Sequence, residues 1–545
     1  MRTSVPRPAG RPMRLAVAVT VVALTAACAT TIPGSPSRSD DKLAGPTKSS
    51  TPAPKPGGGA PSPALERYYT QKVEWGSCAS FAKTDDVSKF DPGSVECGSV
   101  TVPIDYDDPA AGDAKLAVVK LLASGEKQGS LLMNPGGPGG SGVQMVLGQS
   151  GDYSNLAVNK TFDMVGWDPR GVGASTPTIR CYSDAQVDKN RESNLTQDNT
   201  PAGISKQEAF NKAEAELCEK KMGKEFLAHV GTADTVRDLD VLRSVLGDSK
   251  LSYAGFSYGT FIGAMYAERF PGRVRAMVLD GAVDPSEDPD VSDIRQMAGF
   301  QTVFDDYAKD CAKHSECPLG TDPSKAVDEY HKIVRPLIDK QVPASQGRPL
   351  SYSDASTGTI QAMYSPKLWN ALSRALLNIK AGNGALMQKL ADLYMSRDDS
   401  GHYSGMMDAF TAISCMDNTA DTDPAKLGRK DTDIRKAAPF NDDGRGTGHA
   451  AKTACAYWPV KNTLSRHVVK AAPSLPKTVV VSTTHDPATP YANGVSLAKQ
   501  LGAELITFDG SQHTATFEGN ACLDGAVTRY LTSLTVPAEG LKCGG

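Results

Sequence analysis

The sequence predicts an α/β fold, with a mostly parallel sheet flanked by helices and an inserted helical cap. Short apolar runs of strand length, each followed by turn residues, recur up to about residue 280 and resume near Lys477. Between them, residues 293–394 hold several stretches of helical composition. One strand-like run also ends in a serine between two glycines, with a helical segment directly after it. Strands that alternate with helices are typical of a parallel sheet covered on both faces.

Residues 1–27 indicate an export signal. A basic start precedes the apolar run Leu15–Ala27, which is too short to span a bilayer as a mature helix. The run ends in small residues before Cys28, an order that resembles a bacterial lipoprotein cleavage site. We therefore expect Cys28 to carry lipid and hold the protein on the outer face of the cell membrane. The alternative is ordinary cleavage near Ala27 or Ala29, which would leave the protein secreted or associated with the cell wall.

The chain after the signal divides into a tether and a folded part. Residues 28–65 are rich in Pro, Ser, Thr, Gly and Lys without apolar periodicity, so they cannot bury enough surface to fold. The remaining part is too long for one minimal domain. We expect residues 66–285 and 411–545 to form a core in two pieces, with residues 286–410 inserted as the helical cap.

The cysteines predict disulfides. Without Cys28, ten of the eleven cysteines remain, an even number in a chain that is expected to be exported. Proximity along the chain predicts the pairs Cys78–Cys97, Cys181–Cys218, Cys311–Cys317, Cys415–Cys455 and Cys522–Cys543. The alternative is that several stay buried thiols. No C-x-x-C pair occurs and the spacings do not fit a zinc site, so we expect no metal.

The stretch Gly255–Gly259 has the features that a nucleophilic serine requires. Leu251–Ala254 before it is predicted to be a buried strand, and Tyr258–Phe270 after it a helix. A serine on such a sharp turn projects its hydroxyl above the sheet edge, at the positive end of a helix. The G-x-S-x-G pattern alone is weak, since it would arise by chance roughly 0.3 times in a chain of this composition. Its place between a strand and a helix makes Ser257 the candidate nucleophile.

A glycine-rich loop follows another predicted strand. Ser130–Met133 leads into the loop Asn134–Gly142, whose glycines would let a backbone N–H approach a developing oxyanion. The alternatives are a phosphate-binding loop, which lacks its usual Gly-Lys-Ser/Thr ending here, and a plain flexible turn. A third predicted strand, Phe162–Trp167, ends at Asp168 and Arg170, a charged pair that we expect to hold loops near the pocket.

An acid and a base should follow the serine in that order. Asp486 lies just past the predicted strand Lys477–Ser482, and His513 just past the predicted strand Glu504–Phe508. Carboxyl ends of parallel strands meet at one sheet edge, so both residues should lie near Ser257. His513 would accept the serine proton and Asp486 would orient its imidazole. The other histidines lack this setting, and His485 is too close to Asp486 along the chain to receive its hydrogen bond.

These motifs together resemble those of the secreted bacterial tripeptidyl aminopeptidases, relatives of the proline iminopeptidases within the α/β-hydrolase fold. The resemblance spans roughly residues 70–535. It implies that the backbone N–H groups of Gly137 and Tyr258 stabilise the oxyanion. The proline iminopeptidase loop begins with histidine, whereas this loop begins with Asn134-Pro135, which favours the tripeptidyl branch. The motifs that carry the resemblance are Gly136–Gly139, Trp167–Gly173, Gly255–Gly259, Asp486–Pro490 and Gln512–Thr514.

We expect an exported serine exopeptidase that releases short peptides, after the third residue by the resemblance, from free N-termini through an acyl-enzyme. The alternative is a cell-surface carboxylesterase or lipase with the same triad, and the intact triad disfavours a binding protein without catalysis. Binding an α-amino group requires carboxylates, for which Asp417 and one acidic run are candidates, although a solvated loop is the simpler interpretation of the run. The run consists of Asp284, Glu287, Asp288, Asp290 and Asp293.

Charge and composition limit the partners. The net charge is −4 and no basic cluster occurs, so nucleic acid is not an expected partner. Peptide substrates and the membrane, through the lipid anchor, are the expected ones, and no cofactor is expected. The sequence gives no indication of oligomeric state.

Overall fold

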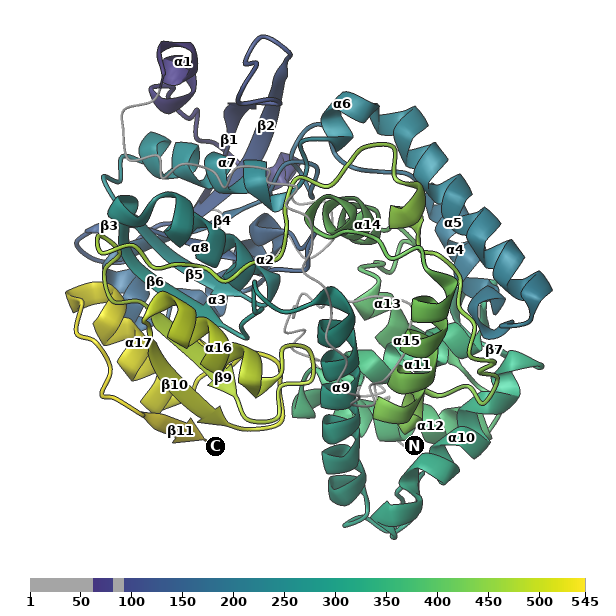
Figure 1. The fold of residues 1–545 in the computed structure, drawn as a ribbon. Helices are drawn as coiled ribbons and strands as arrows, with labels where there is room; N and C mark the ends of the chain where they lie inside the picture. The colour runs from purple at the N-terminus through teal and green to yellow at the C-terminus, as the bar shows by residue number, and fades with distance from the viewer. Residues whose placement is uncertain (1–61, 82–92, 545) are drawn as a thin grey trace, which may run out of the picture.

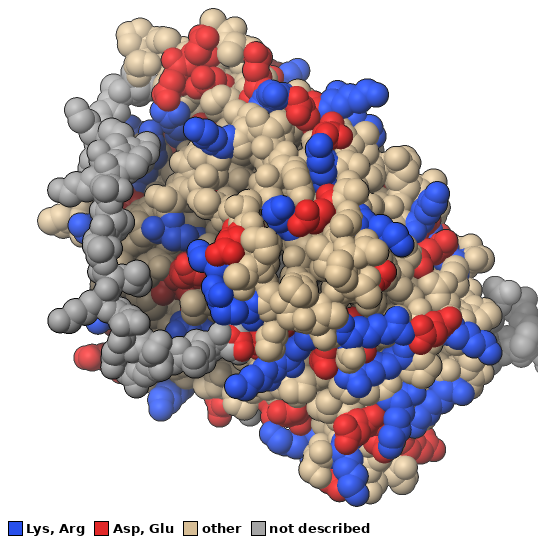
Figure 2. Space-filling model, turned by 45° about the vertical axis from the view of Figure 1, so that its right-hand side comes forward, with Lys and Arg blue, Asp and Glu red and all other residues tan. Residues whose placement is uncertain are grey.

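The structure is a computed structural model that describes residues 62–81 and 93–544 (Figure 1). The predicted signal, Cys28 and nearly all of the predicted tether therefore lie outside the described residues. No helix in the described ranges is both long and apolar enough to cross a membrane. On the face shown in Figure 2, acidic and basic side chains are interspersed, without a large patch of either sign.

A nine-stranded sheet forms the centre of the core, in the order β1-β2-β4-β3-β5-β6-β9-β10-β11. The β1–β2 and β2–β4 pairs are antiparallel, and all the other neighbours are parallel, as the sequence predicts. The strands are β1 (Val95–Pro103), β2 (Asp113–Leu121), β3 (Gly129–Asn134), β4 (Phe162–Trp167), β5 (Leu251–Phe256), β6 (Val274–Asp280), β9 (Val479–Thr483), β10 (Glu504–Asp509) and β11 (Lys542–Gly544).

Helices bury both faces of this sheet, which explains why its strands are continuous apolar runs. Side chains alternate along a strand, so Leu132 of β3 belongs to one apolar cluster while Leu131 and Met133 belong to the other. The first cluster is completed by helices α7, α8 and α16, and the second by α2 and α17. These helices are α2 (Gly142–Gly148), α7 (Thr232–Val245), α8 (Tyr258–Arg269), α16 (Tyr491–Leu501) and α17 (Ala521–Ser533).

A helical layer beside the sheet has an apolar core of its own, which contains Phe300, Phe304, Tyr330 and Leu376. It occupies the lower right of Figure 1. Its helices are α9 (Pro289–Cys311), α10 (Ala326–Val334), α11 (Tyr352–Met363), α12 (Trp369–Lys380) and α13 (Ala385–Tyr394), with the short strands β7 (Val342–Pro343) and β8 (Pro349–Leu350).

The helical layer also draws on residues outside the expected range 286–410. Helix α15 (Pro424–Ala437), from the stretch that we expected in the core, packs along α9. It follows α14 (Met406–Asp417), whose first turn lies against the glycine loop, since a Cβ on Gly139 would stand 2.7 Å from the Met406 carbonyl oxygen.

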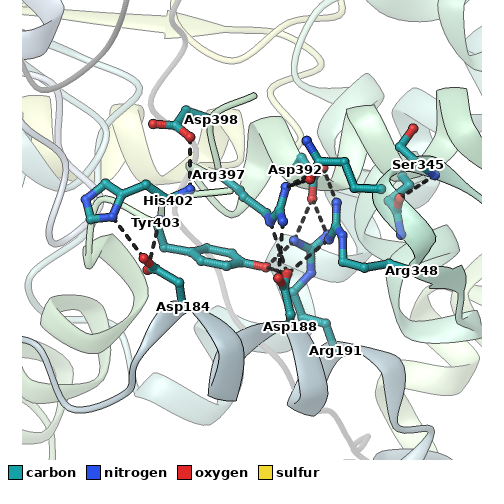
Figure 3. Close-up of polar contacts among 12 residues, drawn as sticks. Asp184, Asp188, Arg191, Ser345, Arg348, Asp392, Arg397, Asp398, His402 and Tyr403 are labelled. Atoms are coloured by element: carbon teal, nitrogen blue, oxygen red, sulfur yellow. Dashed lines mark hydrogen bonds and ion pairs between the residues drawn. The ribbon is translucent and has the colours of Figure 1, made fainter. Parts of the chain in front are cut away.

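Buried ion pairs join the layer to α4 (Asp184–Glu192), which precedes it by about a hundred residues in the sequence (Figure 3). Arg191 of α4 contacts Asp354 at 2.9 Å and Asp392 at 2.6 Å, and Arg348 contacts Asp392 at 2.6 Å. All four side chains are buried. Removing one partner would leave an uncompensated buried charge, so this network holds α4 against the layer.

Five disulfides are present, and they are the five pairs that the sequence predicts. Cys181–Cys218 joins the segment before α4 to helix α5 (Pro201–Met222). Cys415–Cys455 holds the end of α14 against a short 3₁₀ helix, Ala454–Tyr457. Each bridge therefore ties an α-helix to a segment outside the α-helices and the sheet.

Candidate active site

Ser257 occupies a sharp turn between β5 and α8. Its backbone has φ 53° and ψ −126°, a conformation that few residues other than glycine adopt. A Cβ on Gly255 would stand 2.4 Å from the Gly259 carbonyl oxygen, and one on Gly259 would stand 2.5 Å from the Asn134 carbonyl oxygen. Any side chain at either position would collide with backbone. The two glycines of the motif are therefore required by the tightness of the turn.

The glycine loop after β3 lies directly against this turn. A Cβ on Gly136 would stand 2.5 Å from the Phe256 carbonyl oxygen and 2.7 Å from the backbone nitrogen of Tyr258. The side chain of Asn134 accepts a hydrogen bond of 2.9 Å from the Gly136 N–H, which holds the start of the loop. Gly137 has φ +114°. The loop segment that carries the Gly137 N–H and the turn that carries the Tyr258 N–H are thus in contact, as an oxyanion site requires.

His513 and Asp486 are paired. Nδ1 of His513 lies 2.8 Å and 3.0 Å from the two carboxylate oxygens of Asp486. Asp486 Oδ1 also accepts the N–H groups of Ala488 and Thr489, at 2.9 Å and 2.8 Å. The hydroxyl of Thr489 lies 3.1 Å from Asp486 Oδ2 and 3.4 Å from His513 Nδ1. Sequence analysis did not single out Thr489, whose place three residues after the acid was its only signal.

Ser257 and His513 line one pocket. In the described part of the chain, the buried Nε2 atom of His513 has no hydrogen-bond partner. Catalytic hydrogen bonds are often long without substrate and tighten in the complex, so this geometry is compatible with a serine–histidine pair. The residues that line the pocket are Pro135, Met145, Gln149, Tyr153, Phe256, Ser257, His513, Thr514, Thr516 and Glu518.

A profile of the α/β hydrolase fold matches residues 129–520, which include the serine turn, the glycine loop, Asp486 and His513. The chain belongs to the α/β hydrolase family. Serine protease Hip1 of Mycobacterium tuberculosis is 48% identical over 482 residues, covering 87% of this hydrolase and 91% of the relative. Carboxylesterase B of the same organism is 47% identical, with coverages of 86% and 89%. Tripeptidyl aminopeptidase of Streptomyces lividans is 31% identical, with coverages of 88% and 88%.

The charged pair after β4 in this hydrolase has structural partners. Asp168 accepts hydrogen bonds from the Ser141 hydroxyl at 2.6 Å and from the Val143 N–H at 3.1 Å, so it holds the start of α2. Arg170 is fully buried and forms an ion pair of 2.6 Å with Asp238 on α7. Asp168 thus holds the start of α2, and Arg170 is held against α7.

The acidic run does not present free carboxylates, because each member that we considered has a partner within the protein. Asp284 accepts from Ser286 and Gln500, Glu287 pairs with Arg295, Asp288 caps α9, and Asp290 and Asp293 both pair with Lys430.

Asp417 is buried beside the nucleophile turn. It accepts hydrogen bonds from the N–H and hydroxyl of Thr232, at 2.9 Å and 2.6 Å, and from the hydroxyl of Tyr258. Burial raises the pKa of its carboxyl. Because these donors occupy the carboxylate, Asp417 ties α7, α8 and α14 together at the base of the site.

Glu518 is the carboxylate among the residues that line the pocket. It forms an ion pair of 2.7 Å with Lys367, whose side chain is 60% exposed. Sequence analysis did not single out Glu518, since it lies five residues past His513 in a loop without a strand signal. The pocket of this hydrolase therefore combines apolar walls with one anionic group that is shared with an exposed lysine.

No cluster of three or more potential metal ligands occurs in residues 62–81 or 93–544. His485, the other histidine near the acid, contacts Asp306 at 2.5 Å and is exposed.

Proposed function

We propose that this α/β hydrolase is a serine peptidase that releases short peptides from free N-termini. The observation that carries the proposal is the serine turn beside a pocket that also holds a histidine paired to an aspartate. Two relatives with names of peptidases, at 48% and 31% identity over most of the chain, support amide rather than ester hydrolysis.

In the proposed reaction, the Ser257 hydroxyl oxygen bonds to the scissile carbonyl carbon while its proton passes to Nε2 of His513. The N–H groups of Gly137 and Tyr258 donate to the resulting oxyanion. The C–N bond then breaks, and the leaving amine takes the electron pair and the proton from His513. Water then attacks the acyl carbon while His513 takes its proton. The ester bond to Ser257 breaks, the Ser257 oxygen takes the proton from His513, and the peptide leaves with a free carboxyl group.

We further propose that the released product is a tripeptide. The name of the Streptomyces lividans relative supports this length. The helical layer also reaches the site itself, since Tyr364, just past the end of α11, contacts His513. A layer that close would leave room for a short peptide segment on the acyl side of the scissile bond.

A carboxylesterase is the second candidate function, favoured by the 47% identical relative with that name. Ester and amide hydrolysis use the same residues, so the choice depends on rates rather than on the site. Matched pairs of tripeptide amides and short-chain acyl esters separate the two. An ester preference larger than the intrinsic reactivity difference between the substrates would favour the esterase.

The experiment for the exopeptidase proposal compares Ala-Ala-Pro amides with free and acetylated N-termini. An acetyl group removes the α-ammonium and leaves its binding carboxylate unpaired, which costs a few kcal/mol in a buried site, or about a hundredfold in kcat/KM. Mass spectrometry of products from longer peptides measures the released length. Equal rates for the two amides, or cleavage far from the N-terminus, would contradict the proposal.

We also propose that the protein is exported and anchored through a lipid on Cys28, outside the described residues. The basic, apolar and small-residue order of residues 1–28 supports this location. A Cys28→Ser variant should lose metabolic lipid labelling and move from the membrane fraction to the medium. Recovery of the unaltered protein from the medium, with its N-terminus at another residue, would contradict the anchor.

A further inference from the structure

Asp280, the last residue of β6, connects the serine turn to the histidine loop, the loop after β10 that contains His513. Its backbone carbonyl accepts the Ser257 N–H at 2.9 Å. Its carboxylate oxygen Oδ2 accepts the N–H groups of Ala515 at 2.9 Å and Thr516 at 2.6 Å. One fully buried residue therefore bonds both the segment that carries the candidate nucleophile and the segment just after the candidate base.

The strand register places Asp280 between the other elements of the site. Asp280 is opposite Phe256 of β5, the residue before Ser257, on one side and opposite Val481 of β9 on the other. Ser257 follows β5 and Asp486 follows β9. Asp280 thus lies at the end of the strand between β5 and β9, at the sheet edge where the candidate catalytic groups are found.

The backbone of the histidine loop is strained, so contacts with other segments are needed to maintain its conformation. Thr514 and Phe517 have φ of 61° and 68°, values that are uncommon for residues other than glycine. Gly281 leaves room for the loop, since a Cβ there would stand 3.1 Å from Cε1 of His513 and 2.9 Å from the Thr514 methyl carbon. The two N–H groups that donate to Asp280, those of Ala515 and Thr516, follow Thr514 directly and lie within this strained stretch.

The Asp280 carboxylate has no cation to neutralise it in the described structure. Its Oδ1 atom is buried without a hydrogen-bond partner. Burial, and to a lesser degree the charge of Asp486, raise the pKa of the Asp280 carboxyl to about 6. Asp486, the charged group that acts on this carboxyl, lies on the loop after β9. Burial of a charged carboxylate is energetically unfavourable, so we expect a function for one that bonds the segment just after the candidate base.

We propose that Asp280 is a positioning residue, whose carboxylate holds the strained loop after His513 and fixes the imidazole relative to Ser257. The inference rests on the proposed function only in taking Ser257 as nucleophile and His513 as base. It does not depend on which acyl compound is cleaved.

The test is the rate at which a fluorophosphonate labels Ser257, measured in the full chain. This probe needs the nucleophile and base but no particular substrate, so a failed peptidase proposal leaves the test readable. Asp280→Ala should slow labelling about a hundredfold, the order expected from a displacement of about 1 Å. Asp280→Asn keeps one acceptor oxygen for both N–H groups and should slow it less than tenfold, a limit of about 1.4 kcal/mol.

The comparison of the Ala and Asn variants separates positioning from a merely structural role. A residue that holds the loop through its acceptor oxygen is rescued by the conservative variant, so labelling of Asp280→Asn should be at least tenfold faster than labelling of Asp280→Ala. Asp163→Asn is the matched control. Asp163 is a buried strand aspartate that also accepts a backbone N–H, and it lies at the start of β4, at the sheet edge opposite to the candidate site. Labelling of Asp280→Ala at the unaltered rate, or equal slowing of Asp280→Ala and Asp280→Asn, would overturn the proposal.

Discussion

Tyr364 contacts His513 in two ways. The Tyr364 carbonyl, just past the end of α11, accepts the His513 N–H at 3.0 Å. The two rings also meet edge to face, with centroids 5.4 Å apart. The helical layer therefore fixes the candidate base directly, and a change in its packing would be felt at the site.

Tyr364→Ala should lower kcat about threefold to tenfold, since an aromatic contact of this kind contributes about 0.5–1.5 kcal/mol. Tyr364→Phe keeps the ring and should retain at least half of the activity. Both variants keep the carbonyl that binds the His513 N–H. Phe304→Leu serves as the control, because Phe304 lies in the same apolar core and should change stability without changing kcat. Equal kcat for the Ala and Phe variants would contradict the prediction.

Ser257→Ala should abolish turnover while leaving the fold intact, since the hydroxyl lies on a turn whose shape the two glycines maintain. The loss should be about 10⁴ to 10⁶ in kcat. Ser252→Ala, on the same strand, is the matched control and should stay within about twofold. A fluorophosphonate should label Ser257 alone, as peptide mapping by mass spectrometry will reveal. Labelling at a different serine would refute the assignment.

Asp280→Asn should stabilise the protein at neutral pH. Because the folded pKa of about 6 lies above the ordinary 3.8, the folded state binds this proton more tightly than the unfolded chain. Ionisation of Asp280 therefore lowers the free energy of unfolding by up to about 3 kcal/mol above pH 6, and it has no effect below about pH 4. Urea unfolding should show a gain of about 1–3 kcal/mol for the variant at pH 7, shrinking as the pH falls to 4.5. A variant less stable than the parent at pH 7 would contradict this.

Lys367→Met should strengthen binding of substrates that carry a positive group in the pocket. The exposed lysine competes for Glu518, and its removal leaves that carboxylate with one cation fewer. We expect KM for such a substrate to fall about twofold to fivefold, a small effect typical of exposed pairs. KM for the matched neutral substrate should not change. The control variant Lys389→Met breaks the exposed ion pair between Lys389 of α13 and Asp399, and it should leave KM for both substrates unchanged. An equal change for charged and neutral substrates would count against a role of Glu518 in binding.

Much of the fold was accessible from local patterns. Gly255 and Gly259 flank Ser257 because the turn leaves no room for side chains, and this requirement is visible in five consecutive residues. The β-branched run before Asp486 and the strand before His513 are equally local signals. Parallel strands end at a common edge, so their order alone brings these residues to one side of the sheet. Proximity along the chain was also sufficient to pair the ten cysteines.

Contacts between distant segments were not accessible in this way. Asp280 and Ala515 are 235 positions apart, and nothing in the residues around Asp280 distinguishes it from an ordinary aspartate at a strand end. Tyr364 and Glu518 reach the site only because of how the helical layer and the histidine loop pack. Helix α15 was expected in the core but packs on α9, and α4 joins the layer through Arg191.

The sequence by itself therefore determined the elements, their order along the sheet edge and the groups able to do the chemistry, because these follow from periodicity and turn chemistry within short windows. Only the tertiary structure decided which side chains hold the base, which carboxylate faces the pocket and which helices form the layer above it. Those outcomes depend on the packing of surfaces that are remote in the chain. Burial, not local pattern, also sets the pKa of Asp280 at about 6.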